Sequence, residues 1–332
     1  MKKRLSKNIE WSILICTILL VIIGLIALFS ATQSAEYDEF KKQMLWIGIS
    51  IPFIIAFVII DYETIAKISP IFYGVIIILL VGVLFTEPIN GATSWFSIGS
   101  ATLQPAEFAK IIVIFFLSFI MSKMAKKGKK EISRPTRLLI LIAIIAIPVL
   151  LIIKQPDYGT AMAFLVSFIM MLFVGGIDKK YIIASVLIIV ITVPLLYIFV
   201  LPDHAKKRIE VFLNQDLDPR GAGYNLTQSK LAIGAGQLLG MGLFKGNQTQ
   251  LGYLSPKTTD FIFSVIGEEM GFLIAAAIII LYVVLITKAI YVAKTAKDNL
   301  GSYIAIGIAG ILLFHMTENI GMTIGLLPIT GV

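Results

Sequence analysis

The chain has 332 residues, of which 58% are hydrophobic and 14% are charged, and its formal net charge is +8. Soluble domains carry about 25% charged residues, so this composition excludes a soluble enzyme and indicates helices that cross a membrane. The apolar runs are continuous rather than alternating, which excludes a β-barrel. A single cysteine, Cys16, and two histidines exclude a disulfide framework and a His-rich metal centre.

Nine apolar runs predict an all-α polytopic membrane protein with nine transmembrane helices. They lie at residues 11–30, 44–60, 69–85, 106–122, 138–153, 160–176, 181–200, 260–287 and 301–326. The first run is longer than the core of a signal peptide, so we expect it to be retained as a span. The segment 201–260, between the seventh and eighth spans, is too long for a structureless loop. We expect it to fold at the membrane surface, with short helices over 203–214 and 224–239.

The distribution of basic residues predicts the orientation of the chain. With a cytoplasmic N-terminus, the inner segments hold 17 Lys and Arg residues, whereas the outer short loops hold 3. This bias places the N-terminus in the cytoplasm and the 201–260 segment outside the cell. Because most basic residues lie where orientation signals lie, we expect no nucleic-acid partner.

The stretch 253–271 joins the polar outer segment to the eighth span. A Ser-Pro pair favours a turn, and Thr259 or Asp260 is placed to cap the helix that follows. Helical spacing of i, i+4, i+7 and i+11 predicts one narrow face of small or polar groups, made of Asp260, Ser264, Gly267 and Gly271. Such a face lines a cavity or lets another helix approach closely. Asp260 is then either a helix cap or the carboxylate of an outward-facing site.

Other ionisable residues lie within the predicted spans, where such groups are costly. Glu107 and Lys110 have i, i+3 spacing, which predicts an ion pair that is either structural or presents Lys110 to an anionic head group. For the 268–269 acid pair we expect partners on a neighbouring helix. His315 and Glu318 also have i, i+3 spacing, and we expect a packing network there rather than a proton relay.

The outer segment carries a set of cations as well as Asp260. They are Lys206, Lys207, Arg208, Arg220, Lys245 and Lys257. Cations of this kind hold a diphosphate, and a carboxylate acts as a base or holds a divalent ion. The alternative is attraction to anionic lipid at the membrane surface. These residues alone leave a transporter and an enzyme with a lipid substrate open.

Six stretches of the chain occur in the order found in one known family. They are Gly91–Trp95, Gln104–Lys110, Gln155–Thr160, Gly223–Ser229, Thr259–Glu269 and Asn319–Pro328. On these stretches the chain resembles the SEDS family (shape, elongation, division, sporulation), which includes RodA, FtsW and SpoVE, and is most similar to its RodA branch. The resemblance implies a single membrane domain over 1–332, of the ten-span type, with 201–260 as an extracellular segment within it.

The resemblance also implies a function. The family polymerises lipid II into glycan strands on the outer face of the bacterial plasma membrane, with inversion at the anomeric carbon and departure of undecaprenyl diphosphate. Implied partners are a class B penicillin-binding protein and other membrane proteins of the elongation complex. Asp260 matches the family's essential aspartate, as general base or as a ligand for Mg²⁺ or Mn²⁺. Expected substrate-binding residues are Trp95, Gln104, Glu107, Lys110, Asp157, Arg208, Gln228, Ser229, Lys257 and Thr259.

Three departures from the family pattern stand out. Ser255-Pro256 replaces the usual Pro-Glu, and Thr259 stands where many members have His. Members continue beyond Val332 into a tenth span, so the resemblance implies that this chain lacks that end, is less stable than an extended form and polymerises little. The competing functions are a lipid II flippase and a non-catalytic scaffold. A flippase also needs polar residues along a path to the cytoplasm, and the cytoplasmic half carries few.

Overall fold

The computed structural model describes most of the chain. The described residues are 10–33, 36–88, 92–98, 101–126, 128–181, 183, 206, 210–214, 217–218 and 221–329. The predicted span 181–200 and the predicted helix over 203–214 fall mostly outside them, and Arg208 does so as well.

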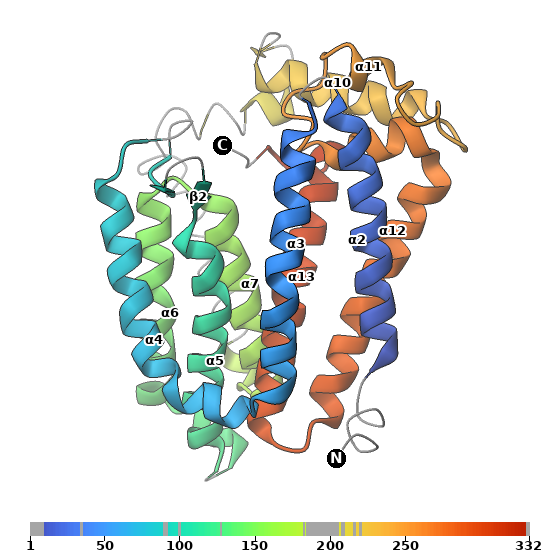
Figure 1. The fold of residues 1–332 in the computed structure, drawn as a ribbon. Helices are drawn as coiled ribbons and strands as arrows, with labels where there is room; N and C mark the ends of the chain where they lie inside the picture. Colours follow the sequence, from blue (N-terminus) through green and yellow to red (C-terminus); the bar gives the residue numbers. More distant parts are fainter. Residues whose placement is uncertain are drawn as a thin grey trace. The chain divides into compact units, whose positions relative to one another are not determined.

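Helices dominate the described residues (Figure 1). They are α2 (Trp11–Ala31), α3 (Asp38–Ile59), α4 (Tyr62–Gly82), η2 (Val83–Phe85), α5 (Pro105–Ala125), η3 (Lys129–Ser133), α6 (Pro135–Lys154), α7 (Tyr158–Val174), α10 (Ala222–Ala235), α11 (Asn247–Gln250), α12 (Ile262–Thr295) and α13 (Asn299–Thr323). Within this part of the chain, 7 helices are long and apolar enough to cross a membrane, and α7 is a shorter apolar helix of 17 residues. These helices match every predicted span except 181–200, which confirms the polytopic helical fold. The predicted second helix of the 201–260 segment is also confirmed, as α10.

One short hairpin was not predicted. Strands β1 (Phe96–Ile98) and β2 (Ala101–Leu103) pair antiparallel, with Phe96 opposite Leu103. Strands of 3 residues are too short to show an alternating pattern, so the sequence does not reveal them. The hairpin leads directly into α5.

The chain divides into two compact units. Unit 1 comprises Met1–Ile55, Pro202–Lys288 and Met316–Ile329, and unit 2 comprises Ala56–Leu201, Ala289–His315 and Thr330–Val332. Helices α3, α12 and α13 contribute residues to both units. The single membrane domain over 1–332 stays a prediction.

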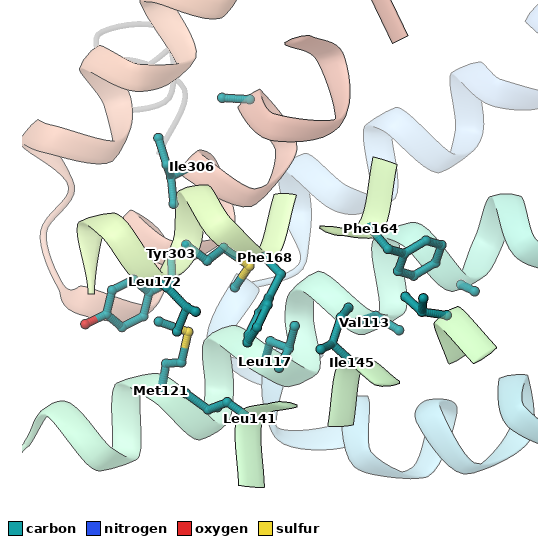
Figure 2. Packing of buried hydrophobic residues seen from close by; sticks show 14 of the residues in the cluster. Val113, Leu117, Met121, Leu141, Ile145, Phe164, Phe168, Leu172, Tyr303 and Ile306 are labelled. Carbon is teal, nitrogen blue, oxygen red and sulfur yellow. The ribbon is translucent and has the colours of Figure 1, made fainter. Parts of the chain in front are cut away.

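Unit 2 is built around a core of apolar side chains from α5, α6, α7 and the first part of α13 (Figure 2). On α5, Val113, Leu117 and Met121 recur every four residues and are almost completely buried. Proline at the first position of α5 suits a helix start, because that residue has no N–H to leave unpaired. This core fixes α5, the helix that carries Glu107 and Lys110.

In unit 1, α12 is interrupted at Gly271, whose φ of 79° and ψ of 178° are not helical. The interruption frees peptide groups, and the turn after α10 pairs with them. The N–H groups of Met241 and Gly242 donate to the carbonyls of Glu268 and Glu269 at 2.9 and 3.0 Å. Beyond the break, Phe272 N–H donates to Gln237 O at 2.9 Å and Leu273 N–H to Leu238 O at 3.2 Å. Backbone groups in an apolar setting must be paired, so this turn makes the break tolerable.

The predicted face of small and polar groups on this helix is therefore wrong at both ends. α12 begins at Ile262, so Asp260 precedes the helix, and Gly271 interrupts it. Between these ends the expected close approach is confirmed. A Cβ added at Gly236 would overlap the carbonyl oxygen of Gly267, so the end of α10 lies against the α12 backbone.

Candidate functional site

The predicted site residues fall into two groups, one on each unit. Gln228, Ser229, Lys257, Thr259 and Asp260 belong to unit 1, whereas Trp95, Gln104, Glu107, Lys110 and Asp157 belong to unit 2.

Asp260 lies in the turn that leads into α12 and is half-buried. The turn is closed by hydrogen bonds from Phe261 N–H to Pro256 O at 3.3 Å and from Ile262 N–H to Thr259 O at 3.4 Å. Leu254 and Phe261 are each 1% exposed and belong to one small apolar cluster, which anchors the turn on both sides of Asp260. A carboxylate at the start of a helix is favoured by the helix dipole. Asp260 is thus held at the boundary between a buried cluster and the surface.

Glu268 and Glu269, on α12, are 0% and 2% exposed. The carboxylate of Glu268 accepts from Gln248 N–H at 2.7 Å, from Thr249 N–H at 3.0 Å and from the Thr249 hydroxyl at 2.6 Å. Glu269 Oε1 accepts from the Gln250 amide at 2.7 Å and from Gly246 N–H at 3.4 Å. The expectation of partners on a neighbouring helix is confirmed, and that helix is the short α11.

Lys257 lies three residues before Asp260 and is half-buried. Its ammonium group donates to Thr249 O at 2.8 Å. Burial lowers the pKa of Lys257, and the negative charge of Glu269 opposes this shift. The turn that contains Asp260 therefore also contains a cationic side chain.

Ser229 is fully buried between helices. Its hydroxyl lies 2.6 Å from the Ser264 hydroxyl and donates to Thr323 O at 2.7 Å. These contacts connect α10 with α12 and with the end of α13, and a substrate contact by Ser229 stays a prediction. Gln228, the preceding residue, is half-buried, and its contact with substrate stays a prediction.

Lys110, on α5 of unit 2, is an almost buried ammonium group. Its Nζ lies 2.9 Å from Glu107 Oε1, and the side-chain exposures are 7% for Lys110 and 55% for Glu107. The predicted ion pair is confirmed. A second partner, His315 Nε2, lies 2.7 Å from Lys110 Nζ. The sequence did not reveal this contact, because the two residues are 205 positions apart.

Two of the sequence motifs meet in unit 2. The Gln104 amide donates to Asp157 Oδ2 at 2.8 Å, and Asp157 Oδ1 accepts from Thr160 N–H at 3.0 Å. Gln104 precedes α5 and Asp157 caps α7, so the contact ties two helix starts together. Gln155 is 0% exposed, and its amide donates to Leu80 O at 3.1 Å. These hydrogen bonds hold the start of α5, the helix that carries Glu107 and Lys110, against the start of α7, and the end of α6 against α4.

Trp95 stands just before β1 and is half-buried. Its carbonyl accepts from the Thr86 hydroxyl at 3.2 Å, which connects Trp95 with the C-cap residue of η2. Thr259 is exposed. Substrate contacts by either residue stay predictions.

These groups define what each unit offers chemically. Unit 1 supplies a half-buried carboxylate, Asp260, and a half-buried lysine three residues earlier in the same turn. Unit 2 supplies a buried ammonium group with an acid and a histidine. Among the described residues, no three or more His, Cys, Asp or Glu side chains are arranged to hold a metal ion.

The profile of the FtsW/RodA/SpoVE family, described as cell cycle protein, matches residues 10–332. The chain belongs to this family. Among curated relatives, peptidoglycan glycosyltransferase MrdB of Escherichia coli is 35% identical over 265 residues, which cover 80% of this chain and 70% of that protein. Peptidoglycan glycosyltransferase RodA of Treponema pallidum is 27% identical over 409 residues, covering 100% of this chain and 93% of the relative. The family assignment from the six stretches is confirmed.

The FtsW/RodA/SpoVE fold is confirmed by a solved structure. One chain of a peptidoglycan synthase complex aligns with a TM-score of 0.82 at 23% identity, covering 98% of this chain and 90% of that chain. At this identity the likeness concerns the fold alone. The roles of individual residues in this FtsW/RodA/SpoVE protein rest on the geometry described above.

Proposed function

We propose that this protein is a peptidoglycan glycosyltransferase that polymerises lipid II into glycan strands on the outer face of the bacterial plasma membrane, for cell elongation and rod shape. Family membership and the names of the relatives MrdB and RodA support the enzyme class. The observation that carries the residue assignment is Asp260, a half-buried carboxylate in an anchored turn with Lys257 nearby.

The reaction is a displacement at the anomeric carbon of the lipid-linked donor. The 4-hydroxyl oxygen of an acceptor GlcNAc forms the new bond to that carbon. The bond from the carbon to the diphosphate oxygen breaks, and its electrons leave with undecaprenyl diphosphate. Asp260 takes the hydroxyl proton, and such general-base assistance contributes about 10²–10⁴-fold. Lys257 lies in the same turn, three residues before Asp260, and its ammonium group stabilises the negative charge of the leaving diphosphate.

Asp260 also fits a second role, as a ligand for Mg²⁺ or Mn²⁺. An unperturbed aspartate, with a pKa of about 3.9, is a weak base for a sugar hydroxyl. Mg²⁺ is usually bound by one or two carboxylates together with substrate phosphates, and a single carboxylate at Asp260 matches that donor set. Such an ion, when bound, neutralises charge on the diphosphate.

The proposal includes a location and a partner. We propose that the N-terminus is cytoplasmic, as the distribution of basic residues predicts. We also propose that a class B penicillin-binding protein cross-links the glycan strands that this protein makes. The solved structure of similar fold belongs to a synthase complex that coordinates polymerization and crosslinking, which supports this pairing.

The test is polymerisation of lipid II by the purified protein with Mg²⁺ or Mn²⁺, with glycan strands separated on a gel. Asp260→Asn should lower the rate by about 10²-fold or more, since it removes the charge and keeps the size. The matched control is Asp61→Asn, at another helix start. Asp61 caps Glu63 N–H at 3.2 Å, and asparagine caps equally well. Equal rates for wild type and Asp260→Asn refute the assignment, and transfer of labelled lipid II across vesicles without glycan strands favours a flippase.

A further inference from the structure

We infer that Glu268 is a positioning residue for Asp260, acting through α11; this inference rests on the proposed function. Both oxygens of its buried carboxylate are occupied at the start of α11. Oε1 accepts from Gln248 N–H at 2.7 Å, and Oε2 accepts from Thr249 N–H at 3.0 Å and from the Thr249 hydroxyl at 2.6 Å. Burying a carboxylate is costly unless its oxygens are paired, and here the donors to Glu268 come from one short segment.

The residues held by Glu268 in turn hold the segment that carries Asp260. Gln248 O accepts from Leu254 N–H at 3.1 Å, and Thr249 O accepts from the Lys257 ammonium at 2.8 Å. Each of these two residues therefore donates to Glu268 and accepts, through its carbonyl, from the 251–261 segment. Movement of α11 would shift both attachment points of the turn that leads to Asp260.

The backbone of Glu268 is itself held in place. The carbonyl of Glu268 accepts from Met241 N–H at 2.9 Å, next to the interruption of α12 at Gly271. The side chain thus extends from a residue whose carbonyl is paired with the turn after α10. Leu254 and Phe261 bury the two ends of the turn in the same apolar cluster. Asp260 is therefore placed by a continuous set of contacts that begins at Glu268.

The neighbouring acid supplies an unusually close control. Glu269 is 2% exposed and also contacts this region, through Oε1. In the part of the chain that the structure describes, Glu269 Oε2 has no hydrogen-bond partner. Glutamine at 269 can keep Oε1 and place its NH₂ where Oε2 was. Glutamine at 268 must instead turn an NH₂ group toward a backbone N–H. Each substitution removes one negative charge, but only Glu268→Gln loses a hydrogen bond from the backbone of α11.

The experiment compares Glu268→Gln and Glu269→Gln, each alone and combined with Asp260→Asn. The measurements are kcat and KM for lipid II polymerisation and Tm in detergent. Misplacement of a reacting group by about 1 Å costs on the order of 10²-fold, so Glu268→Gln should lower kcat by at least about 10-fold with KM changed by less than about 3-fold. Glu269→Gln removes a negative charge near Lys257 but keeps the hydrogen bonds of Oε1, so it should stay within about 3-fold of wild type. With Asp260→Asn present, adding Glu268→Gln should lower the residual rate no further, because the two residues act as one unit.

Equal kcat for Glu268→Gln and Glu269→Gln overturns the inference, and so does an additive loss in the double variant. A wild-type rate for Asp260→Asn refutes the proposed function instead, so the two failures are distinguishable. If Glu268→Gln does not fold, Thr249→Val and Thr249→Ser replace it. Valine removes the hydroxyl that donates to Glu268, whereas serine retains it. A lower kcat for valine alone supports the inference, and equal rates overturn it.

Discussion

Lys110 Nζ lies 2.7 Å from Nε2 of His315. An ammonium group has only donors, so in this hydrogen bond the imidazole Nε2 is the acceptor. With Glu107 Oε1 at 2.9 Å, the buried ammonium has a carboxylate and an imidazole as partners. A carboxylate and an imidazole together satisfy a cation that would otherwise be costly within a span.

This contact predicts different outcomes for two substitutions of His315. His315→Gln keeps an acceptor oxygen within reach of Lys110, whereas His315→Leu removes it. A hydrogen bond to a charged group contributes about 1.5–3 kcal/mol, so His315→Leu should lower the free energy of unfolding by about that amount. His315→Gln should lower the free energy of unfolding by less than half of that amount. Equal losses in thermal unfolding would contradict a direct role of the acceptor.

The close approach of α10 and α12 predicts a steric asymmetry between two glycines. A Cβ at Gly236 would overlap Gly267 O, although its φ of −71° suits any residue. A Cβ at Gly234 meets nothing within 4 Å. Gly236→Ala should therefore lower Tm, by an overpacking cost of about 1–3 kcal/mol. Gly234→Ala should be neutral or stabilising by up to about 1 kcal/mol, because Gly234 lies in the last turn of α10 and alanine is the better helix former. Thermal unfolding in detergent measures both, and a destabilised Gly234→Ala would argue against this packing.

The loop between α12 and α13 predicts a pH dependence of stability. Burial raises the pKa of Asp298, but hydrogen bonds from Gly301 N–H and the Tyr62 hydroxyl outweigh it and leave the pKa below its usual 3.8. Because the pKa is depressed in the folded state, this contribution to stability is complete above the unfolded value of about 3.9 and is lost as the pH falls through the lowered pKa.

Tyr62→Phe tests this dependence. Removal of the hydroxyl should destabilise the protein at neutral pH, and the difference from wild type should shrink as Asp298 becomes protonated. The control is Tyr253→Phe, at a residue with 49% exposure, which should change little at any pH. A Tyr62→Phe deficit that stays constant from neutral pH to acid would contradict the role of the charged carboxylate.

The proposed orientation predicts which side of the membrane each loop faces. Lys126 and Tyr253 are exposed and belong to the predicted inner and outer segments. On a Cys16→Ala background, an impermeant thiol reagent should label Tyr253→Cys in intact cells and Lys126→Cys only after permeabilisation. In intact cells, labelling of Lys126→Cys without labelling of Tyr253→Cys would show that the orientation is the opposite of the proposed one.

Local patterns in the sequence determined the membrane architecture. Long apolar runs identify helices that cross a membrane, because burying a span in hydrocarbon needs only length and composition. The i, i+3 spacing of Glu107 and Lys110 predicted their ion pair, because helical geometry alone brings such residues together. The six motif stretches led to the family in the same way, since they are read along the chain.

Only the tertiary structure decided which distant groups meet. Nothing in the local pattern marks Gly271 as a break rather than a packing residue, because the break depends on hydrogen bonds from the turn after α10. The same holds for the contact of Lys110 with His315 and of Glu268 with Thr249. Each joins residues brought together by helix packing, and the favourable energy of such a pair appears only once the neighbouring side chains have excluded solvent.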